Sequence, residues 1–260
     1  MNRIQNAFDQ AKKEGRAAFI PYLPAGYPSK EQFVKDALEL LEHADLMEIG
    51  LPYSDPLGDG PTIQRATEKA LRQGFTMLDF FDAIKAVRAQ TDKALLVMTY
   101  YNPILAWGEE AFIRDVKAAG IDGLILPDLP PDEADTLIPL AEKHDIKLTF
   151  LIAPTSTPDR VQLVSSSCTG FVYAVSVVGV TGARSGEALY EVPELVKLAK
   201  QHTHLPVAVG FGVSDRASAA KVASVADGVV VGSAFINTIE KGGSLSGLAR
   251  AIQEGTFKAS

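Results

Sequence analysis

The sequence predicts an α/β fold in which eight parallel strands close into a (β/α)8 TIM barrel, with an extra N-terminal helix. Short apolar runs rich in β-branched residues recur along the 260 residues, and longer amphipathic segments separate them. Strands that alternate with helices pair in parallel, and eight such repeats in about 250 residues are typical of this barrel. A doubly wound open sheet is the structural alternative.

The eight expected strands share an apolar composition and a length of about 4–8 residues. They lie at 17–23, 46–50, 94–100, 122–127, 147–152, 170–175, 206–211 and 227–232. The segments between them place apolar residues three and four positions apart, as one buried helix face requires. Clear helical patterns lie at 29–44, 109–120, 132–145, 157–166 and 214–226, and the extra helix covers about 2–14.

The composition is that of an ordinary globular protein, with 47% hydrophobic and 22% charged residues. No linker or low-complexity tract divides the chain, so we expect one catalytic barrel domain over 1–260. A single cysteine, Cys168, argues against disulfides and a cysteine metal site, and the net charge of −7 argues against nucleic-acid binding. With neither a signal peptide nor a membrane-spanning run, we expect a cytoplasmic protein.

Two carboxyl groups fall near the end of the second strand, where barrels of this kind carry their chemistry. Strand alternation puts Glu48 on the same side as Leu46 and Gly50, facing the barrel interior. Burial raises a carboxyl pKa, which suits a general acid near neutral pH. Asp59 follows in the glycine-rich loop PLGDGP, over the same mouth. Together they suit the movement of two protons; the alternatives are a structural ion pair for Glu48 and a turn aspartate for Asp59.

Three later loops complete the expected mouth. The stretch SVVGVTGARSG (176–186) is rich in small residues and predicts a mobile lid, the alternative being a disordered surface loop. GFGVS and VVVGSAF, after the seventh and eighth strands, each lead into a helix whose N–H groups and dipole favour an anion. We therefore expect a phosphate site there, and two tight capped turns are the alternative.

The remaining mouth residues are aromatic: Tyr22, Tyr100, Tyr173 and Phe211. An aromatic side and a phosphate-binding side suit a substrate with a flat apolar head and a phosphorylated tail. No histidine or lysine ends a strand, and no dinucleotide, phosphate-loop or serine-nucleophile motif occurs in the required context. Acid–base catalysis by carboxylates, without a metal or a covalent intermediate, is what these residues favour.

Four stretches in this order, MEIGLPYSDPLGDGPTIQRA, VYAVSVVGVTGAR, VGFGVS and VVVGSAF, closely resemble the tryptophan synthase alpha subunit family. The resemblance covers essentially the whole chain. It implies a lyase that cleaves indole-3-glycerol phosphate into indole and glyceraldehyde 3-phosphate by a retro-aldol step. Glu48 and Asp59 match the two catalytic carboxylates of the family. Gly58 stands where alanine is more usual, which would loosen the catalytic loop.

The resemblance also implies substrate contacts. Thr181 matches a lid residue that fixes Asp59 when the lid closes, and Tyr173 matches a pocket residue at the scissile bond. Tyr22 and Tyr100 join them as expected substrate-binding residues. The matches to phosphate and indole contacts are Gly182, Phe211, Gly212, Gly232 and Ser233.

A partner follows from the same resemblance: a beta subunit, in an alpha2beta2 heterotetramer that passes indole internally for tryptophan synthesis. Pyridoxal phosphate (PLP) is expected only in that beta subunit, so this chain should carry no cofactor of its own. The implied docking surface comprises 56–62 and 100–110, with Ile104, Leu105 and Trp107 expected to be exposed unless they form a local packed loop. A stand-alone indole-releasing lyase and a mainly allosteric binding subunit are the functional alternatives.

Overall fold

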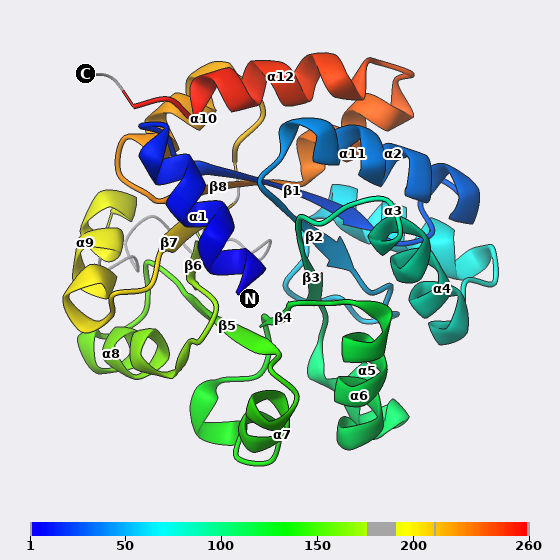
Figure 1. Cartoon of the computed structure of the whole chain (residues 1–260), viewed down its shortest axis with the longest axis horizontal. Helices are drawn as coiled ribbons and strands as arrows, with labels where there is room; N and C mark the ends of the chain where they lie inside the picture. The colour runs from blue at the N-terminus through cyan, green and yellow to red at the C-terminus, as the bar shows by residue number, and fades with distance from the viewer. Residues whose placement is uncertain (1, 176–190, 211, 259–260) are drawn as a thin grey trace.

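The computed structural model describes residues 2–175, 191–210 and 212–258, which form a closed barrel of parallel strands with helices outside it (Figure 1). Each strand pairs with the next in chain order, and β8 closes onto β1. The (β/α)8 barrel is confirmed, and the open sheet is excluded. The strands are β1 (Ala18–Pro24), β2 (Leu46–Gly50), β3 (Ala94–Met98), β4 (Gly123–Leu126), β5 (Lys147–Ile152), β6 (Val172–Val175), β7 (Val207–Gly210) and β8 (Gly228–Val231).

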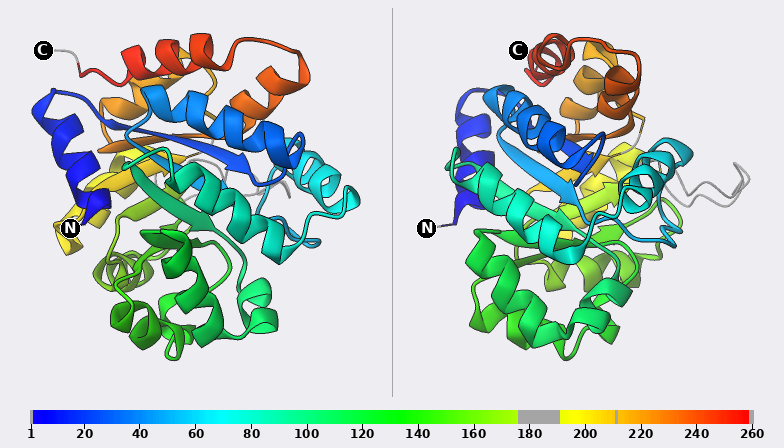
Figure 2. Two further views of the ribbon diagram at one scale, coloured as in Figure 1. Left: turned by 45° about the vertical axis from the view of Figure 1, so that its right-hand side comes forward. Right: turned by 90° about the vertical axis from the view of Figure 1, so that its right-hand side faces the viewer.

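Several helices begin where the sequence supplies a cap. Ser29 accepts from the Gln32 N–H to start α2, and Thr76 and Asp79 form a reciprocal capping box at α4. Figure 2 shows the helices forming an outer ring around the sheet. They are α1 (Arg3–Lys13), α2 (Lys30–His43), α3 (Pro61–Arg72), α4 (Met77–Arg88), α5 (Tyr101–Trp107), α6 (Glu109–Ala119), the 3₁₀ turn η1 (Pro131–Glu133), α7 (Leu137–Lys143), α8 (Pro158–Ser167), α9 (Val192–His202), α10 (Arg216–Ala223), α11 (Ser233–Glu240) and α12 (Leu245–Gly255).

The third strand is shorter than the sequence predicts, because a helix follows it at once. β3 ends at Met98, and Tyr100 is the N-cap residue of α5. The Asp128 carboxylate accepts from the Tyr101 N–H at 3.0 Å, so it satisfies a donor at the start of that helix.

Ile104, Leu105 and Trp107 are expected from the sequence to be exposed, but they lie on the helix α5, and this expectation is wrong for two of them. Ile104 is fully buried rather than exposed. Trp107 is partly buried: its ring packs 5.6 Å from that of Phe81, and its indole N–H donates to Asp115 at 2.9 Å. Leu105 is exposed, as expected. Helical periodicity turns two of the three side chains toward neighbouring elements.

Strand alternation divides the core into two layers, one inside the barrel and one between sheet and helices. In β2, Leu46 joins the inner layer, while Met47 and Ile49 pack in the outer layer. α1 crosses one end of the barrel (Figure 1) and adds Ile4 and Phe8 to the inner layer. This leaves the other end, where the strands terminate, for the side chains of the site.

Near the end that α1 covers, a buried ion pair joins two segments. Both terminal nitrogens of Arg16 donate to the Asp45 carboxylate, one of them at 2.8 Å. The same carboxylate accepts from the Phe19 N–H of β1 at 2.7 Å. Because both side chains are largely excluded from water, the Asp45 charge depends on Arg16 for compensation, while Arg16 also pairs with Glu14 at 2.7 Å.

We expect Arg16→Met to lower the free energy of unfolding by about 3–5 kcal/mol, because it leaves Asp45 as an unpaired buried charge. Urea unfolding followed by circular dichroism measures this change. Arg72→Met is the matched control: its partner Glu68 is 2.6 Å away, but both side chains are well exposed, so less than about 1 kcal/mol should be lost. Equal losses in the two variants would contradict the expectation.

Candidate active site

Glu48 of β2 projects into the barrel, as the alternation predicts. Its side chain is fully buried, and neither carboxyl oxygen has a hydrogen-bond partner among the described residues. Burial raises the pKa of this carboxyl well above its ordinary value, because the protein interior disfavours the charged form. Within the described chain Glu48 is not part of an ion pair, so burial favours the protonated form of this carboxyl group, which can donate a proton.

Asp59 lies in the loop between β2 and α3, and its carboxyl group is also buried. The Asp59 N–H donates to the Pro56 carbonyl at 3.0 Å, and Gln64 of α3 donates to the Asp59 carbonyl at 2.9 Å. Burial raises the pKa of the Asp59 carboxyl to about 7, and a contact with the Tyr100 hydroxyl opposes part of that rise. Asp59 therefore changes charge near neutral pH, where a general base is most useful.

Two tyrosines form walls beside these carboxyl groups. Tyr22 of β1 lies across Gly50, and Tyr173 of β6 lies across Gly210; a Cβ atom on either glycine would lie 2.2 Å from a tyrosine hydroxyl oxygen. Glycine at these two strand ends therefore leaves room for the rings. Burial raises the pKa of both phenols, and ionisation of either neighbouring carboxyl group would raise it further, so the four groups share one electrostatic environment.

Another part of the site is built from backbone at a helix N-terminus. α11 begins at Ser233 after Gly232, and no side chain caps its first turn. α10 differs, because Asp215 caps it by accepting from the Ser218 N–H at 2.8 Å. Gly212, with a φ of +80°, takes a left-handed conformation between β7 and α10. The uncapped N–H groups and the dipole of α11 suit an anion.

These groups line one hollow of about 190 Å³. Tyr100 is not part of its lining and lies behind the Asp59 loop, where its hydroxyl meets the Gly58 N–H. Thr181, Gly182 and Phe211, together with the expected lid at 176–186, lie outside the described residues. The sequence-predicted residues that the hollow brings together are Tyr22, Glu48, Asp59, Tyr173, Gly212, Gly232 and Ser233.

Sequence reasoning missed the uncharged residues that complete the lining: Ile63, Met98, Val213, Ser214, Val230, Ala234 and Asn237. Periodicity could have found two of them. Val230 precedes Gly232 by two residues on β8, and Asn237 follows Ser233 by one helical turn on α11. The apolar members otherwise look like core residues, so only the structure identifies them.

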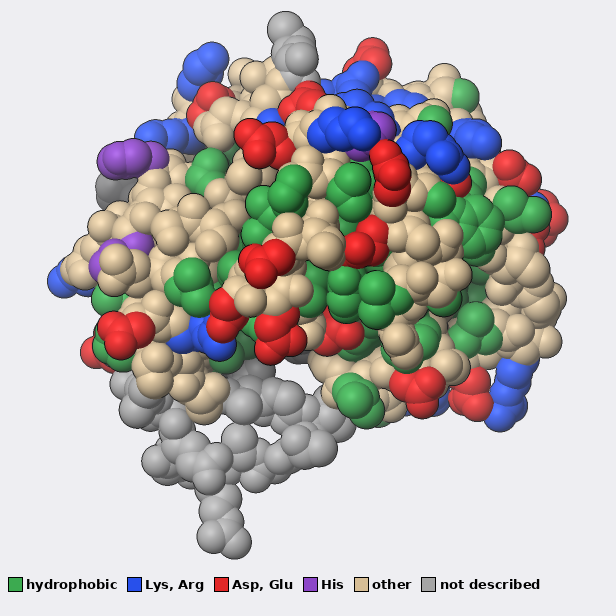
Figure 3. All heavy atoms as spheres, turned by 90° about the horizontal axis from the view of Figure 1, so that it is seen from below, with side chains coloured by type: hydrophobic (Ala, Val, Ile, Leu, Met, Phe, Trp, Pro, Cys, Tyr) green, Lys and Arg blue, Asp and Glu red, His purple; other side chains and the backbone are tan. Residues whose placement is uncertain are grey.

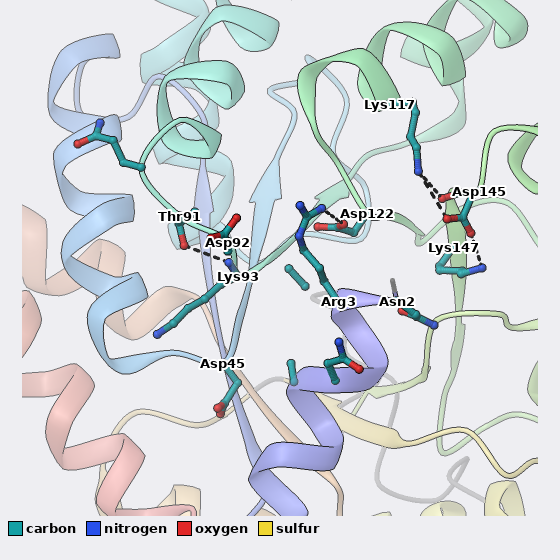
Figure 4. A pocket seen from close by; sticks show the side chains of 14 residues that line it. Asn2, Arg3, Asp45, Thr91, Asp92, Lys93, Lys117, Asp122, Asp145 and Lys147 are labelled. Atoms are coloured by element: carbon teal, nitrogen blue, oxygen red, sulfur yellow. Dashed lines mark hydrogen bonds and ion pairs between the residues drawn. The ribbon is translucent and has the colours of Figure 1, made fainter.

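A larger hollow, of about 850 Å³, lies beside α1 at the other end of the barrel. Figure 4 shows Arg3 reaching from α1 to Asp122, while Lys117 and Lys147 turn toward Asp145. The corresponding N–O distances are 2.9, 3.7 and 2.7 Å. Its charged groups largely pair with one another, so size alone does not identify the site, whereas two unpaired buried carboxyl groups do.

No group of three or more His, Cys, Asp or Glu side chains that could hold a metal ion occurs among the described residues. Over the same part of the chain, none of the helices combines the length and the hydropathy needed to cross a membrane.

The smaller hollow combines a carboxyl group whose pKa burial raises well above its ordinary value, a second one whose pKa is raised to about 7, and aromatic walls. A helix N-terminus beside them can hold an anion. This arrangement supports proton transfer to and from a flat, apolar substrate that is anchored by an anionic group.

Comparisons with known proteins each point to one family. A family model described as tryptophan synthase alpha chain matches residues 8–258. The tryptophan synthase alpha chain of Deinococcus radiodurans is 54% identical over 255 residues, covering 98% of this chain and 94% of that protein. The alpha chain of Mycolicibacterium paratuberculosis is 46% identical, covering 93% of this chain and 89% of its own. A solved structure of Mycobacterium tuberculosis tryptophan synthase matches with a TM-score of 0.91 at 45% identity, covering 99% of both chains.

The raised pKa of Asp59 predicts how the free energy of unfolding depends on pH. Because the carboxyl pKa rises from 3.8 to about 7 on folding, the folded protein binds more protons than the unfolded chain between these pH values. The contribution of Asp59 to stability therefore falls as pH rises through that window. We expect the unfolding free energy of Asp59→Asn, relative to the unsubstituted protein, to rise from about pH 4 to about pH 7 and then to level off. Urea titrations at a series of pH values measure the difference, and a pH-independent difference would refute the assignment.

Proposed function

The chain belongs to the tryptophan synthase alpha chain family, and we propose that Glu48 and Asp59 are the acid–base pair of its reaction. As the alpha subunit of a tryptophan synthase, the chain is a lyase that cleaves indole-3-glycerol phosphate to indole and glyceraldehyde 3-phosphate. The observation that carries the proposal is the Glu48 carboxyl, buried in the barrel with both oxygens unpartnered.

Glu48 performs the proton transfer that makes the carbon–carbon bond breakable. Its protonated carboxyl donates to indole C3, which becomes tetrahedral and can leave with the electrons of the scissile bond. The resulting carboxylate accepts the proton of the side-chain hydroxyl next to that bond. As the bond breaks, the hydroxyl carbon becomes the aldehyde and its former bonding electrons restore the aromatic indole. Positioned acid–base groups of this kind contribute about 10²–10⁴-fold.

Asp59 acts at the indole nitrogen. When C3 gains a proton, positive charge develops on the ring and the N–H becomes more acidic. An ionised Asp59 accepts a hydrogen bond from that N–H and stabilises the charge. Its Oδ1 has no hydrogen-bond partner among the described residues, which leaves this oxygen free for the substrate.

The remaining lining residues hold the substrate between these groups. Tyr22 and Tyr173 offer aromatic surface for the indole ring. The first turn of α11, from Ser233, together with Gly212 and Gly232, offers backbone N–H groups for the phosphate. Fixing both ends of the substrate orients the scissile bond toward Glu48.

The alpha chain family and the tryptophan synthase structures that it matches indicate a beta subunit as the partner. We propose an alpha2beta2 assembly that docks through the loop after β2 and through α5. Leu57, 89% exposed, and Leu105, 50% exposed, lie there as accessible apolar side chains. Elsewhere, Figure 3 shows apolar side chains interspersed with acidic ones on the face seen from below. Leu57 and Leu105 are the exposed apolar groups that we expect the partner to cover.

We assign PLP to that beta subunit, since no lysine that could hold it occurs in the described lining of the hollow. We further propose that the chain acts in the cytoplasm as one catalytic barrel domain. The family matches do not favour a stand-alone lyase or a purely allosteric subunit.

The test of the reaction is release of indole from indole-3-glycerol phosphate by the purified chain, alone and with a beta subunit. We expect Glu48→Gln to fold and bind substrate yet lose the activity by about 10²-fold or more, because it keeps the shape and removes the proton. Asp36→Asn is the matched control: Asp36 is also a buried carboxyl with one unpaired oxygen, but it lies on the outer helix α2. This control should keep the unsubstituted rate.

Each outcome of that test has a meaning. Retention of about a tenth of the rate in Glu48→Gln would overturn its role, since a general acid contributes more than that. Slow release that a beta subunit stimulates supports the alpha-subunit function. Fast release without a partner would support the stand-alone lyase. Full stimulation of the beta subunit by Glu48→Gln, with little cleavage even by the unsubstituted chain, would support the allosteric subunit.

A separate test concerns the phosphate end. Ser233→Asp places a negative charge at the uncapped start of α11, so we expect KM for indole-3-glycerol phosphate to rise about tenfold or more with a smaller change in kcat. Ser244→Asp is the control, because Ser244 is the N-cap of α12 and lies outside the hollow. Steady-state kinetics measure both variants. An unchanged KM in Ser233→Asp would show that the phosphate does not bind at the start of α11.

A further inference from the structure

Tyr100 lies behind the Asp59 loop rather than in the lining of the hollow. We propose that Tyr100 is a positioning residue: its hydroxyl fixes the backbone and the carboxyl group of the loop that carries Asp59, and it acts on the reaction only through Asp59. This inference rests on the function proposed for Asp59, and it differs from the substrate contact expected for Tyr100 from the sequence.

The first observation is the contact between the two elements. The Gly58 N–H donates to the Tyr100 hydroxyl at 2.9 Å, one residue before Asp59. Since the hydroxyl oxygen accepts this bond, its proton remains free to point elsewhere. The Asp59 carboxyl is close enough that the hydroxyl favours its ionised form and so lowers its pKa. The Tyr100 hydroxyl thus interacts with both the backbone of the loop, at Gly58, and the Asp59 side chain.

The second observation is how little else holds this loop. Ser54, Asp55, Leu57 and Gly58 are all exposed. Within the described chain, the side-chain hydrogen bonds that reach 56–59 from other elements come from Tyr100 and from Gln64 of α3. Gln64 binds only backbone carbonyls. Tyr100 is therefore the contact that can set the orientation of the Asp59 carboxyl.

The third observation is that Tyr100 is itself held firmly. Its side chain is 6% exposed. The N–H groups on either side of it are bound, since Thr99 donates to Ile125 at 3.1 Å and Tyr101 donates to Asp128 at 3.0 Å. A residue fixed in this way can transmit its position to the neighbouring loop.

The ring of Tyr100 has a further support. It packs against the ring of Tyr53, with centroids 5.6 Å apart. The Tyr53 hydroxyl accepts from the Asn102 side chain of α5 at 2.9 Å. Asn102, Tyr53 and Tyr100 thus form a continuous chain of contacts that ends at the loop.

Gly58 makes the short contact with Tyr100 easy to reach. A Cβ atom at this position would lie 3.2 Å from the Tyr100 hydroxyl oxygen, closer than side chains usually approach. Glycine therefore leaves the hydroxyl free to bind the backbone N–H without displacement. Glycine in place of the more usual alanine would loosen the loop if nothing else held it. Here the missing Cβ atom leaves room for the Tyr100 hydroxyl, which holds the loop.

The experiment compares Tyr100→Phe with Tyr101→Phe in the full chain, by steady-state cleavage of indole-3-glycerol phosphate over a range of pH. Tyr100→Phe keeps the ring and its packing but loses the hydroxyl. Tyr101→Phe loses a hydroxyl that binds Glu109 at 2.8 Å, away from the loop. We expect Tyr100→Phe to lower kcat about tenfold with little change in KM, the size of effect that one lost hydrogen bond gives. Tyr101→Phe should leave both constants unchanged.

The pH profile separates positioning from a structural effect. Loss of the hydroxyl removes a contact that lowers the Asp59 pKa, so the acidic limb of kcat should move to higher pH in Tyr100→Phe. In an Asp59→Asn background, Tyr100→Phe should cause no further loss, because Tyr100 acts through that carboxyl.

The outcomes are distinguishable. No cleavage by the unsubstituted chain would refute the proposed function. If that chain is active, a Tyr100→Phe variant with the same kcat, KM and pH profile as the unsubstituted chain would overturn this inference. A raised KM at unchanged kcat would make Tyr100 a substrate contact, and an equal further loss in the Asp59→Asn background would make its effect independent of Asp59. Thermal unfolding of each variant identifies any loss that comes from misfolding, and a rate loss without the pH shift also counts against positioning.

Discussion

The rest of the site depends on one costly feature, a carboxyl group buried in the barrel without a partner. An ionised carboxylate in such surroundings would cost several kcal/mol, so the group keeps its proton instead. Everything near Glu48 is consistent with preserving that state: no cation approaches it in the described chain, and the tyrosines beside it are neutral. The barrel fold makes this possible, because parallel strands ring the residue and leave its carboxyl group open only toward the hollow.

In the described part of the chain, charged groups are paired at one end of the barrel and lack partners of opposite charge at the other. At the end covered by α1, Arg16 pairs with Asp45 and Arg88 pairs with Asp122, so the largely buried charges there are compensated. At the other end, Glu48 and Asp59 lack such cations, and their raised pKa values count against the folded state at neutral pH. This division matches the general behaviour of these barrels, in which one end stabilises the fold and the other carries the reaction.

The fold and much of the site could be predicted from the sequence because both follow local patterns. The alternation in β2 is enough to turn Glu48 inward, and glycines after β7 and β8 mark the turns near the uncapped helix. The position of Tyr100 could not be predicted, since the strand pattern continues through it while the actual strand ends at Met98. Which side of the Asp59 loop its ring occupies depends on tertiary contacts with Gly58 and Tyr53, and no periodicity encodes those.

The different ways in which the two carboxyl groups are held suit their different tasks. Glu48 sits on a strand whose backbone is hydrogen-bonded on both sides, so its position is as rigid as the sheet. Asp59 sits on an exposed loop that a few side chains tether, so its position and its charge can respond to what lies around it. A proton donor to carbon needs fixed geometry, whereas a group that answers a developing charge on nitrogen needs a pKa near the working pH. The strand supplies the first requirement and the tethered, partly desolvated loop supplies the second.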